Sequence, residues 1–198
     1  MERIESSKIE KLMSIIGDSR RISIVSHLKP DGDALGSCVA MFHFLGQCGK
    51  DDIRIVLPDS YPSYLDFITE GLQGKDILTY SHDSSEAEKA IASSDLIICL
   101  DFNAFHRTDS LENSLETSNA AKILIDHHLN PDTESFDLVF SKTEISSASE
   151  LLYHILMATP VLNGTAAYLD IKASTALMTG MTTDTNNFAN STYPSTLR

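Results

Sequence analysis

Metal-binding side chains stand at the ends of several apolar runs in this sequence. His27, Asp101 and His127 each follow a short, mainly apolar segment of the kind that forms a buried strand. Because the carboxyl ends of parallel strands meet at one edge of a sheet, we expect these three side chains to converge. A mixed set of imidazole and carboxylate ligands favours Mn²⁺ or Mg²⁺ over a thiolate-bound zinc ion. The sequence therefore predicts a metal centre at this edge.

Three further carboxylates extend the predicted centre. Asp31 and Asp33 flank Gly32 just after His27, and Asp184 stands in a Thr-rich segment that we expect to be a turn after a helix. Each of the six residues alone is more often structural or solvated, but the presence of His27, Asp101 and His127 at three successive strand ends favours a role as metal ligands. Two imidazoles and four carboxylates are too many for one ion and suit a pair. Paired ions about 3.5–4 Å apart activate a bridging hydroxide for in-line displacement at phosphorus.

The elements that must position these side chains alternate along the chain. Strands alternating with helices predict an α/β fold, a doubly wound, mostly parallel sheet flanked by helices. We expect strands at 21–26, 52–57, 77–80, 95–101, 122–126 and 137–140, and helices at 4–16, 33–45, 63–70, 84–92 (with Ser84 as N-cap), 108–115, 147–157 and 165–178.

Composition narrows the functional classes. The 198 residues suffice for one well-packed domain, and their formal charge of −13 argues against long double-stranded DNA as a partner. A short phosphorylated substrate stays open, because bound divalent ions reverse the local potential. The three cysteines show no paired-motif spacing, and no apolar stretch approaches the roughly 20 residues of a membrane span. We therefore expect a cytoplasmic protein with free thiols and no membrane contact.

Four segments carry a resemblance to a known family. Asp126-His127-His128 after an apolar strand is similar to the signature of the DHH phosphoesterase superfamily. The segment 26–37 (SHLKPDGDALGS) resembles the first motif of that family, Asp101 stands where the aspartate of its second motif does, and 180–185 (GMTTDT) resembles its fourth. The four segments occur in the family's order and span nearly the whole chain.

The resemblance implies roles for individual residues. His128 would face the substrate phosphate or its leaving group, with Asp126 supporting the histidines. It also implies two Mn²⁺ ions, with Mg²⁺ or Co²⁺ as alternatives. One ion would be held by His27, Asp31 and Asp101, and the other by Asp33, Asp101, His127 and Asp184, so that Asp101 bridges the pair.

Within the superfamily, the chain looks most like the branch of nanoRNases and pAp phosphatases. Arg107 and the segment 146–150 (SSASE) resemble intermediate segments of that branch, and Arg107 is either a phosphate contact or a solvated side chain. Branch members carry a DHH-associated domain with a GGGH-type motif, which is missing from this sequence. We therefore expect residues 1–198 to form the catalytic domain alone, without that C-terminal substrate-binding domain. Asn186-Asn187 also departs from the usual ending of the fourth motif.

These observations predict a metal-dependent phosphoesterase. Its substrate would be a short oligonucleotide or a small phosphorylated nucleotide, such as nanoRNA, pAp or a cyclic dinucleotide. A type II inorganic pyrophosphatase is one alternative, although the Ser-Lys-Lys motif of that family is missing here. A non-catalytic nucleotide-binding regulatory module is another. The sequence leaves a homodimer open.

Overall fold

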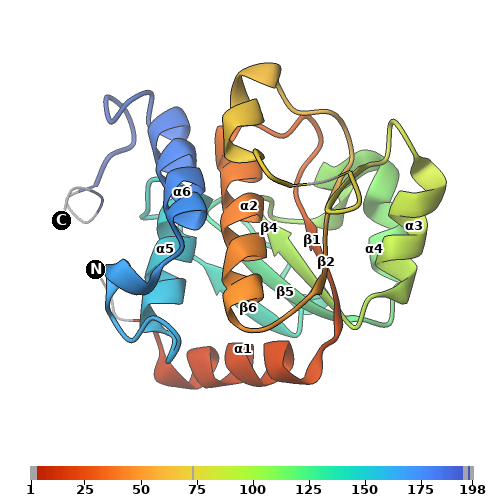
Figure 1. The fold of residues 1–198 in the computed structure, drawn as a ribbon, viewed down its shortest axis with the longest axis horizontal. Coiled ribbons are helices and arrows are strands. Elements are labelled where there is room, and N and C mark those ends of the chain that lie inside the picture. Colours follow the sequence, from red (N-terminus) through yellow and green to blue (C-terminus); the bar gives the residue numbers. More distant parts are fainter. Residues whose placement is uncertain (1–3, 73, 194–195, 197–198) are drawn as a thin grey trace.

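A single parallel sheet forms the centre of the computed structural model, which describes residues 4–72, 74–193 and 196 (Figure 1). Its six strands run in the order β3-β2-β1-β4-β5-β6, and every neighbouring pair is parallel. The predicted α/β class and doubly wound sheet are confirmed. The strands are β1 (Arg21–Val25), β2 (Asp52–Leu57), β3 (Ile77–Thr79), β4 (Leu96–Leu100), β5 (Ala121–Asp126) and β6 (Leu138–Ser141).

The order of the strands reverses between β1 and β4. Val25 pairs with Val56 of β2 on one side and with Cys99 of β4 on the other, and Leu100 pairs with Ile125 of β5. The carboxyl ends of β1, β4 and β5 therefore lie level with one another. In open α/β sheets, ligands bind in the crevice outside such a reversal point.

Helices cover both faces of the sheet (Figure 1). Side chains alternate between the two faces along each strand: Ile98 joins a core with α1, α2, α5 and α6, whereas Cys99 joins a core with α3 and α4. The α-helices are α1 (Ser6–Asp18), α2 (Gly32–Gln47), α3 (Ser84–Ser93), α4 (Glu112–Thr117), α5 (Ala148–Ala158) and α6 (Ile171–Asp184). Short 3₁₀ helices are η1 (Ser63–Ile68), η2 (Phe105–Leu111), η3 (Thr133–Ser135) and η4 (Ala166–Tyr168).

Several predicted helices differ in detail. The segment 63–70 is the 3₁₀ helix η1, because so short a segment closes with bonds to the third residue back, such as Thr69 N to Asp66 O at 3.2 Å. The segment 108–115 is divided between η2 and α4, and η2 is itself interrupted at Asp109, whose φ is 50°. The predicted N-cap Ser84 is wrong: the carboxylate of Asp83 accepts the Glu86 amide at 3.1 Å and caps α3.

The last helix differs most from its prediction. The expected helix 165–178 is replaced by η4 and then α6, which begins after its N-cap Asp170 and ends at Asp184. Thr182 and Thr183 are thus helical, and their hydroxyls donate to backbone carbonyls four residues back, at 2.7 and 2.9 Å. Such bonds satisfy a threonine hydroxyl inside a helix. Asp184 therefore projects from the end of a helix and not from a turn.

Two other expectations concern the cysteine thiols and membrane-spanning helices. Cys38, Cys48 and Cys99 are free, as predicted, and two of them are buried. None of the helices in the described part of the chain combines the length and the apolar character that a bilayer span requires.

The close approach of α2 and α6 gives a test of the packing. A Cβ on Gly36 of α2 would lie 2.5 Å from the carbonyl oxygen of Ala176 in α6, so the two backbones meet at this glycine. We expect Gly36→Ala to lower the free energy of unfolding by about 1–3 kcal/mol, as overpacking does. Gly46→Ala in the same helix is the matched control, because a Cβ there meets no atom within 4 Å. It should leave stability unchanged or raise it by up to about 1 kcal/mol. Urea denaturation of both variants measures the difference, and equal effects would contradict this account of the crossing.

Candidate metal centre

The structure brings all six predicted ligands to the edge where the strand order reverses. Their ligand atoms form overlapping groups, with the atoms of each group within 4.8 Å of one another. One group is His27, Asp31 and Asp101; a second is Asp33, His127 and Asp184; a third joins Asp101 to His127 and His128. The residues present thus suit divalent cations, and the predicted ligands are neighbours in space.

Asp101 lies at the middle of the cluster. It follows β4, its side chain is 4% exposed, and its carboxylate oxygens lie 3.5 Å from His27 Nε2 and 3.4 Å from His127 Nε2. Its backbone has a left-handed φ of 63°, a conformation that aspartate tolerates better than most residues and that often marks functional sites. Oδ1 is buried without a hydrogen bond. A buried carboxylate oxygen with no donor is what a cation would satisfy.

The two imidazoles present their Nε2 atoms to this carboxylate. His27 Nδ1 lies 2.8 Å from the Leu28 carbonyl; donation of Nδ1–H to that oxygen leaves Nε2 as the ligand atom. Burial lowers the pKa of both His27 and His127, but the neighbouring carboxylates, Asp101 above all, outweigh burial and raise each pKa to about 9. Burial alone would raise the pKa of Asp101, yet contacts with His127 and His27 hold it below its ordinary value.

Asp31 and Asp33 occupy the start of α2. Asp31 is its N-cap, and its Oδ1 accepts the amides of Asp33 and Ala34, both at 3.0 Å. Asp33 is 1% exposed and lies 3.9 Å from His127 Nε2. Asp31 therefore lies near His27 and Asp33 lies near His127, so two residues separated only by Gly32 lie on different sides of Asp101.

The N-terminus of α5 holds the Asp33 carboxylate. The amide of Ala148 donates to Oδ2 at 2.6 Å, and the amide of Ser149 donates to Oδ1 at 2.9 Å. Free amides and the dipole at a helix N-terminus favour a negative charge there. Ser147 caps this helix by accepting the Glu150 amide at 3.0 Å. Ser147-x-x-Glu150 has the spacing of a capping box and marks a helix start in the sequence, but the contact of this helix with Asp33 was not predicted.

Asp184 reaches the same group from the end of α6. Its carboxylate lies 3.8 Å from His127 Nε2. The approach requires a glycine one turn earlier, because a Cβ on Gly180 would lie 2.0 Å from Ser149 Oγ and 2.7 Å from Asp33 Oδ1. Three helices therefore meet at this side of the cluster: α2, α5 and α6.

The remaining predicted residues lie around the ligands. His128 Nδ1 is 2.7 Å from Asp126 Oδ1, and the His128 amide donates to Asp126 Oδ2 at 3.1 Å. This carboxylate orients the ring, although His128 also belongs to a possible ligand group with Asp101. Arg107 is exposed in η2, where its carbonyl accepts the Leu28 amide at 2.9 Å. The structure thus places Arg107 beside the His27 loop.

The cluster carries more negative charge than its own imidazoles balance. Burial raises the pKa of Asp33, with the nearby Asp101 adding to the effect. Burial also raises the pKa of Asp184, again with a contribution from Asp101. Carboxylates that hinder one another's ionisation in this way would be relieved by bound divalent cations.

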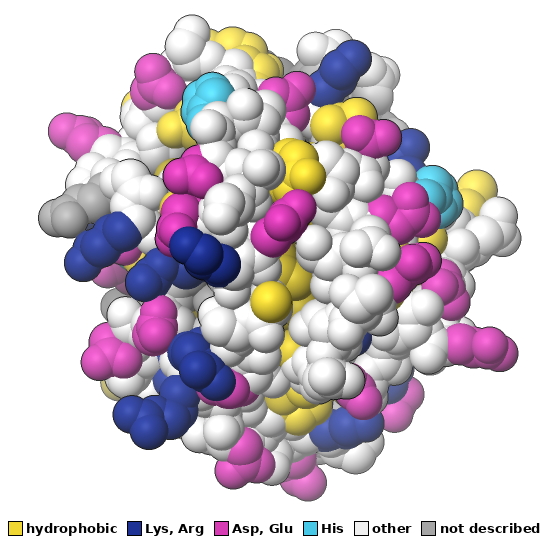
Figure 2. Space-filling model, turned by 90° about the vertical axis from the view of Figure 1, so that its right-hand side faces the viewer, with side chains coloured by type: hydrophobic (Ala, Val, Ile, Leu, Met, Phe, Trp, Pro, Cys, Tyr) yellow, Lys and Arg dark blue, Asp and Glu magenta, His cyan; other side chains and the backbone are white. Residues whose placement is uncertain are grey.

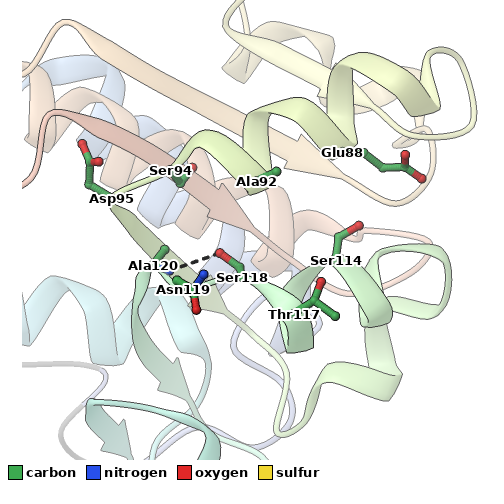
Figure 3. A pocket seen from close by; sticks show the side chains of 9 residues that line it. All are labelled: Glu88, Ala92, Ser94, Asp95, Ser114, Thr117, Ser118, Asn119 and Ala120. Carbon is green, nitrogen blue, oxygen red and sulfur yellow. Dashed lines mark hydrogen bonds between the residues drawn. The ribbon is translucent and has the colours of Figure 1, made fainter.

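The face of the molecule covered by α3 and α4 differs from the metal centre in the charges that it carries. Figure 2 looks onto the face covered by α3 and α4, where acidic and basic side chains are mixed. A pocket of about 470 Å³ between α3 and α4 is lined by Asp95 and Ala120, which directly precede β4 and β5 (Figure 3). It therefore lies at the amino ends of the strands, away from the metal centre.

Comparisons with known proteins define the class. The model of the DHH family, N-terminal domain, matches residues 21–181, which is most of the chain. The chain therefore belongs to the DHH family, and its candidate metal centre is of the kind that a metal-dependent hydrolase uses.

Solved structures agree with this assignment. An exopolyphosphatase-related protein from Bacteroides fragilis is 33% identical, with a TM-score of 0.85 over 96% of this chain. RecJ from Thermus thermophilus is similar in fold, with 16% identity and a TM-score of 0.52 over 90% of this chain. A further RecJ exonuclease structure gives 19% identity and a TM-score of 0.50 over 87% of this chain. The chain spans 54%, 24% and 42% of the length of these three proteins, respectively.

The contact between α5 and Asp33 allows one side of the candidate centre to be perturbed without the other. Ala148 is the first residue of α5, a position where proline fits a helix, so Ala148→Pro removes one of the two amides that hold Asp33 while keeping the helix start. We expect Mn²⁺ binding at the side of Asp33, His127 and Asp184 to weaken by roughly 10- to 100-fold, as when the partner of a ligand is lost. Calorimetric titration should still show binding at the side of His27 and Asp31.

The control is Ser84→Pro, at the exposed first residue of α3. It should leave both binding steps unchanged. Equal weakening of both steps by Ala148→Pro, with an unchanged circular dichroism spectrum, would contradict the separate role of α5.

Protons compete with metal at the two imidazoles. Because the pKa of His27 and His127 is about 9, an ion that binds Nε2 displaces a proton below that pH. We expect Mn²⁺ affinity to rise between pH 6.5 and 8.5, by up to about tenfold per pH unit for each proton displaced. Titrations in two buffers of different ionisation enthalpy count the released protons. An affinity that does not change with pH would contradict the raised pKa values.

Proposed function

We propose that this chain acts as the catalytic domain of a metal-dependent phosphoesterase that hydrolyses short oligonucleotides or small phosphorylated nucleotides. The observation that carries the proposal is the buried Asp101, whose carboxylate is shared by two groups of candidate ligands. A shared carboxylate between two ligand groups is the arrangement of a two-metal centre. Membership of the DHH family supports the same activity.

The donor set supports Mn²⁺ as the resident ion. Its oxygen and imidazole ligands suit Mn²⁺, Mg²⁺ or Co²⁺, and the sulfur atoms of buried Cys38 and Cys99 do not belong to any of the ligand groups. The two RecJ structures of the same fold contain manganese. A pair of such ions, when bound, would stabilise negative charge on a phosphoryl group and activate a water molecule.

The chain's own residues would orient the reaction. Asp126 accepts Nδ1–H of His128, which leaves Nε2 of His128, a ring 37% exposed, as the nitrogen that can give a proton to the leaving oxygen. We assign the phosphate contact to Arg107, which is exposed in η2 beside the His27 loop.

Asp101 gives the direct test. We expect Mn²⁺-dependent phosphate release from pAp or from a dinucleotide, and we expect Asp101→Asn to lower kcat/KM by more than the roughly 100-fold typical of losing a partner of a metal ligand. Asp51→Asn, an exposed aspartate before β2, is the control and should retain full activity. If phosphate is released from pyrophosphate but not from pAp or a dinucleotide, the result would favour the pyrophosphatase alternative. Bound Mn²⁺ without hydrolysis of any of these substrates would contradict the proposal and favour a binding module.

A further inference from the structure

We propose that a groove beside the metal centre binds the nucleobase of the substrate, and that it prefers a base with an exocyclic amino group. The groove lies between η1 and α6 and has a volume of about 510 Å³. Small-molecule sites typically have volumes of about 300–1,000 Å³. The inference rests on the function proposed above, because it places the base of a nucleotide whose phosphate lies at the metal centre.

One end of the groove lies beside chain segments that carry candidate metal ligands. Thr183 lines it and directly precedes the ligand Asp184. Thr183 also lies against Gly32, since a Cβ at that glycine would be 2.3 Å from Thr183 Oγ1. Gly32 separates the ligands Asp31 and Asp33, so a molecule in the groove adjoins segments from both sides of the centre. On the opposite wall, η1 follows β2 at the same edge of the sheet.

The walls offer flat apolar surfaces to an aromatic ring. Tyr64 and Phe67 of η1 are 66% and 56% exposed, and Met178 of α6 is 54% exposed. Side chains three residues apart in a 3₁₀ helix lie on the same side, so the two rings border the groove together. Exposed aromatic rings are the surfaces on which nucleic acid bases stack.

The hydroxyls along α6 give the groove its preference. Thr175, Thr179, Thr182 and Thr183 each donate their hydroxyl hydrogen to a backbone carbonyl four residues back, at 2.7–2.9 Å. In this arrangement their oxygens keep lone pairs that can accept hydrogen bonds from a ligand. An exocyclic amino group, as on adenine, guanine or cytosine, is a donor of the required kind. None of the described residues that line the groove is charged, so it offers little to a bare phosphate chain.

Binding of nucleotides to the full chain in Mg²⁺, measured by calorimetry, tests this inference without turnover. Adenosine 5′-monophosphate should bind at least about tenfold more tightly than ribose 5-phosphate, since stacking of one base contributes that much. Tyr64→Ala and Phe67→Ala should each reduce this advantage and leave ribose 5-phosphate binding unchanged. Tyr168→Ala is the matched control, because Tyr168 is 61% exposed in η4 and does not line the groove. Purine riboside 5′-monophosphate, which lacks the amino group, should bind more weakly than adenosine 5′-monophosphate.

The alternatives give different results. Equal affinity for adenosine 5′-monophosphate and ribose 5-phosphate would overturn the inference, and phosphate release from pAp would show that the proposed function still holds. If the base binds in a Tyr64-dependent way but none of the substrates is hydrolysed, the groove is still the base-binding site and the proposed catalytic function is contradicted. If Tyr64→Ala changes the sedimentation coefficient but not nucleotide affinity, the groove is a contact between copies of the chain and the inference is overturned.

Discussion

A negative charge buried at the end of a central strand is the constraint on which this structure depends. Asp101 is 3% exposed, and a carboxylate removed from water is costly unless cations or donors face it. Here it has a histidine from the loop after β1 on one side and a histidine from the end of β5 on the other. Because β1, β4 and β5 are adjacent parallel strands, their order alone puts these three groups together.

A second constraint on the structure is that the N-terminus of α5 faces the carboxylate of Asp33. This carboxylate is as buried as Asp101, yet both of its oxygens accept amides from α5. Gly180 allows α6 to approach both Asp33 and Ser149, and Gly36 allows α6 to approach α2. The arrangement of the helices around the centre therefore depends on the absence of a side chain at these two positions.

The strands and their ends were predicted well from the sequence, because a short apolar run followed by polar residues is compatible with few structures other than a buried strand. Asp184 was expected in a turn, since threonine and aspartate weaken a helix on propensity alone, but packing of α6 against α2 overrides that preference. The contact between α5 and Asp33 joins residues 115 and 116 positions apart, which no local pattern indicates. The groove was missed for the same reason, because its walls come from η1 and α6 and meet only in the folded chain.

The two sides of Asp101 are built in different ways, and this has a thermodynamic consequence. His27 and Asp31 come from one loop, four residues apart, so an ion there would link that loop only to Asp101 at the end of β4. Asp33, His127 and Asp184 come from α2, the end of β5 and α6, and Asp33 is itself held by α5. An ion on this side links elements that are far apart in the sequence, and such a site does not exist in the unfolded chain. Since a ligand that binds only the native state stabilises it by mass action, the gain in stability from metal should come chiefly from the side that contains Asp33. An ion held by His27 and Asp31, whose Asp31 side chain is 56% exposed, would therefore exchange more readily than one held by the buried Asp33.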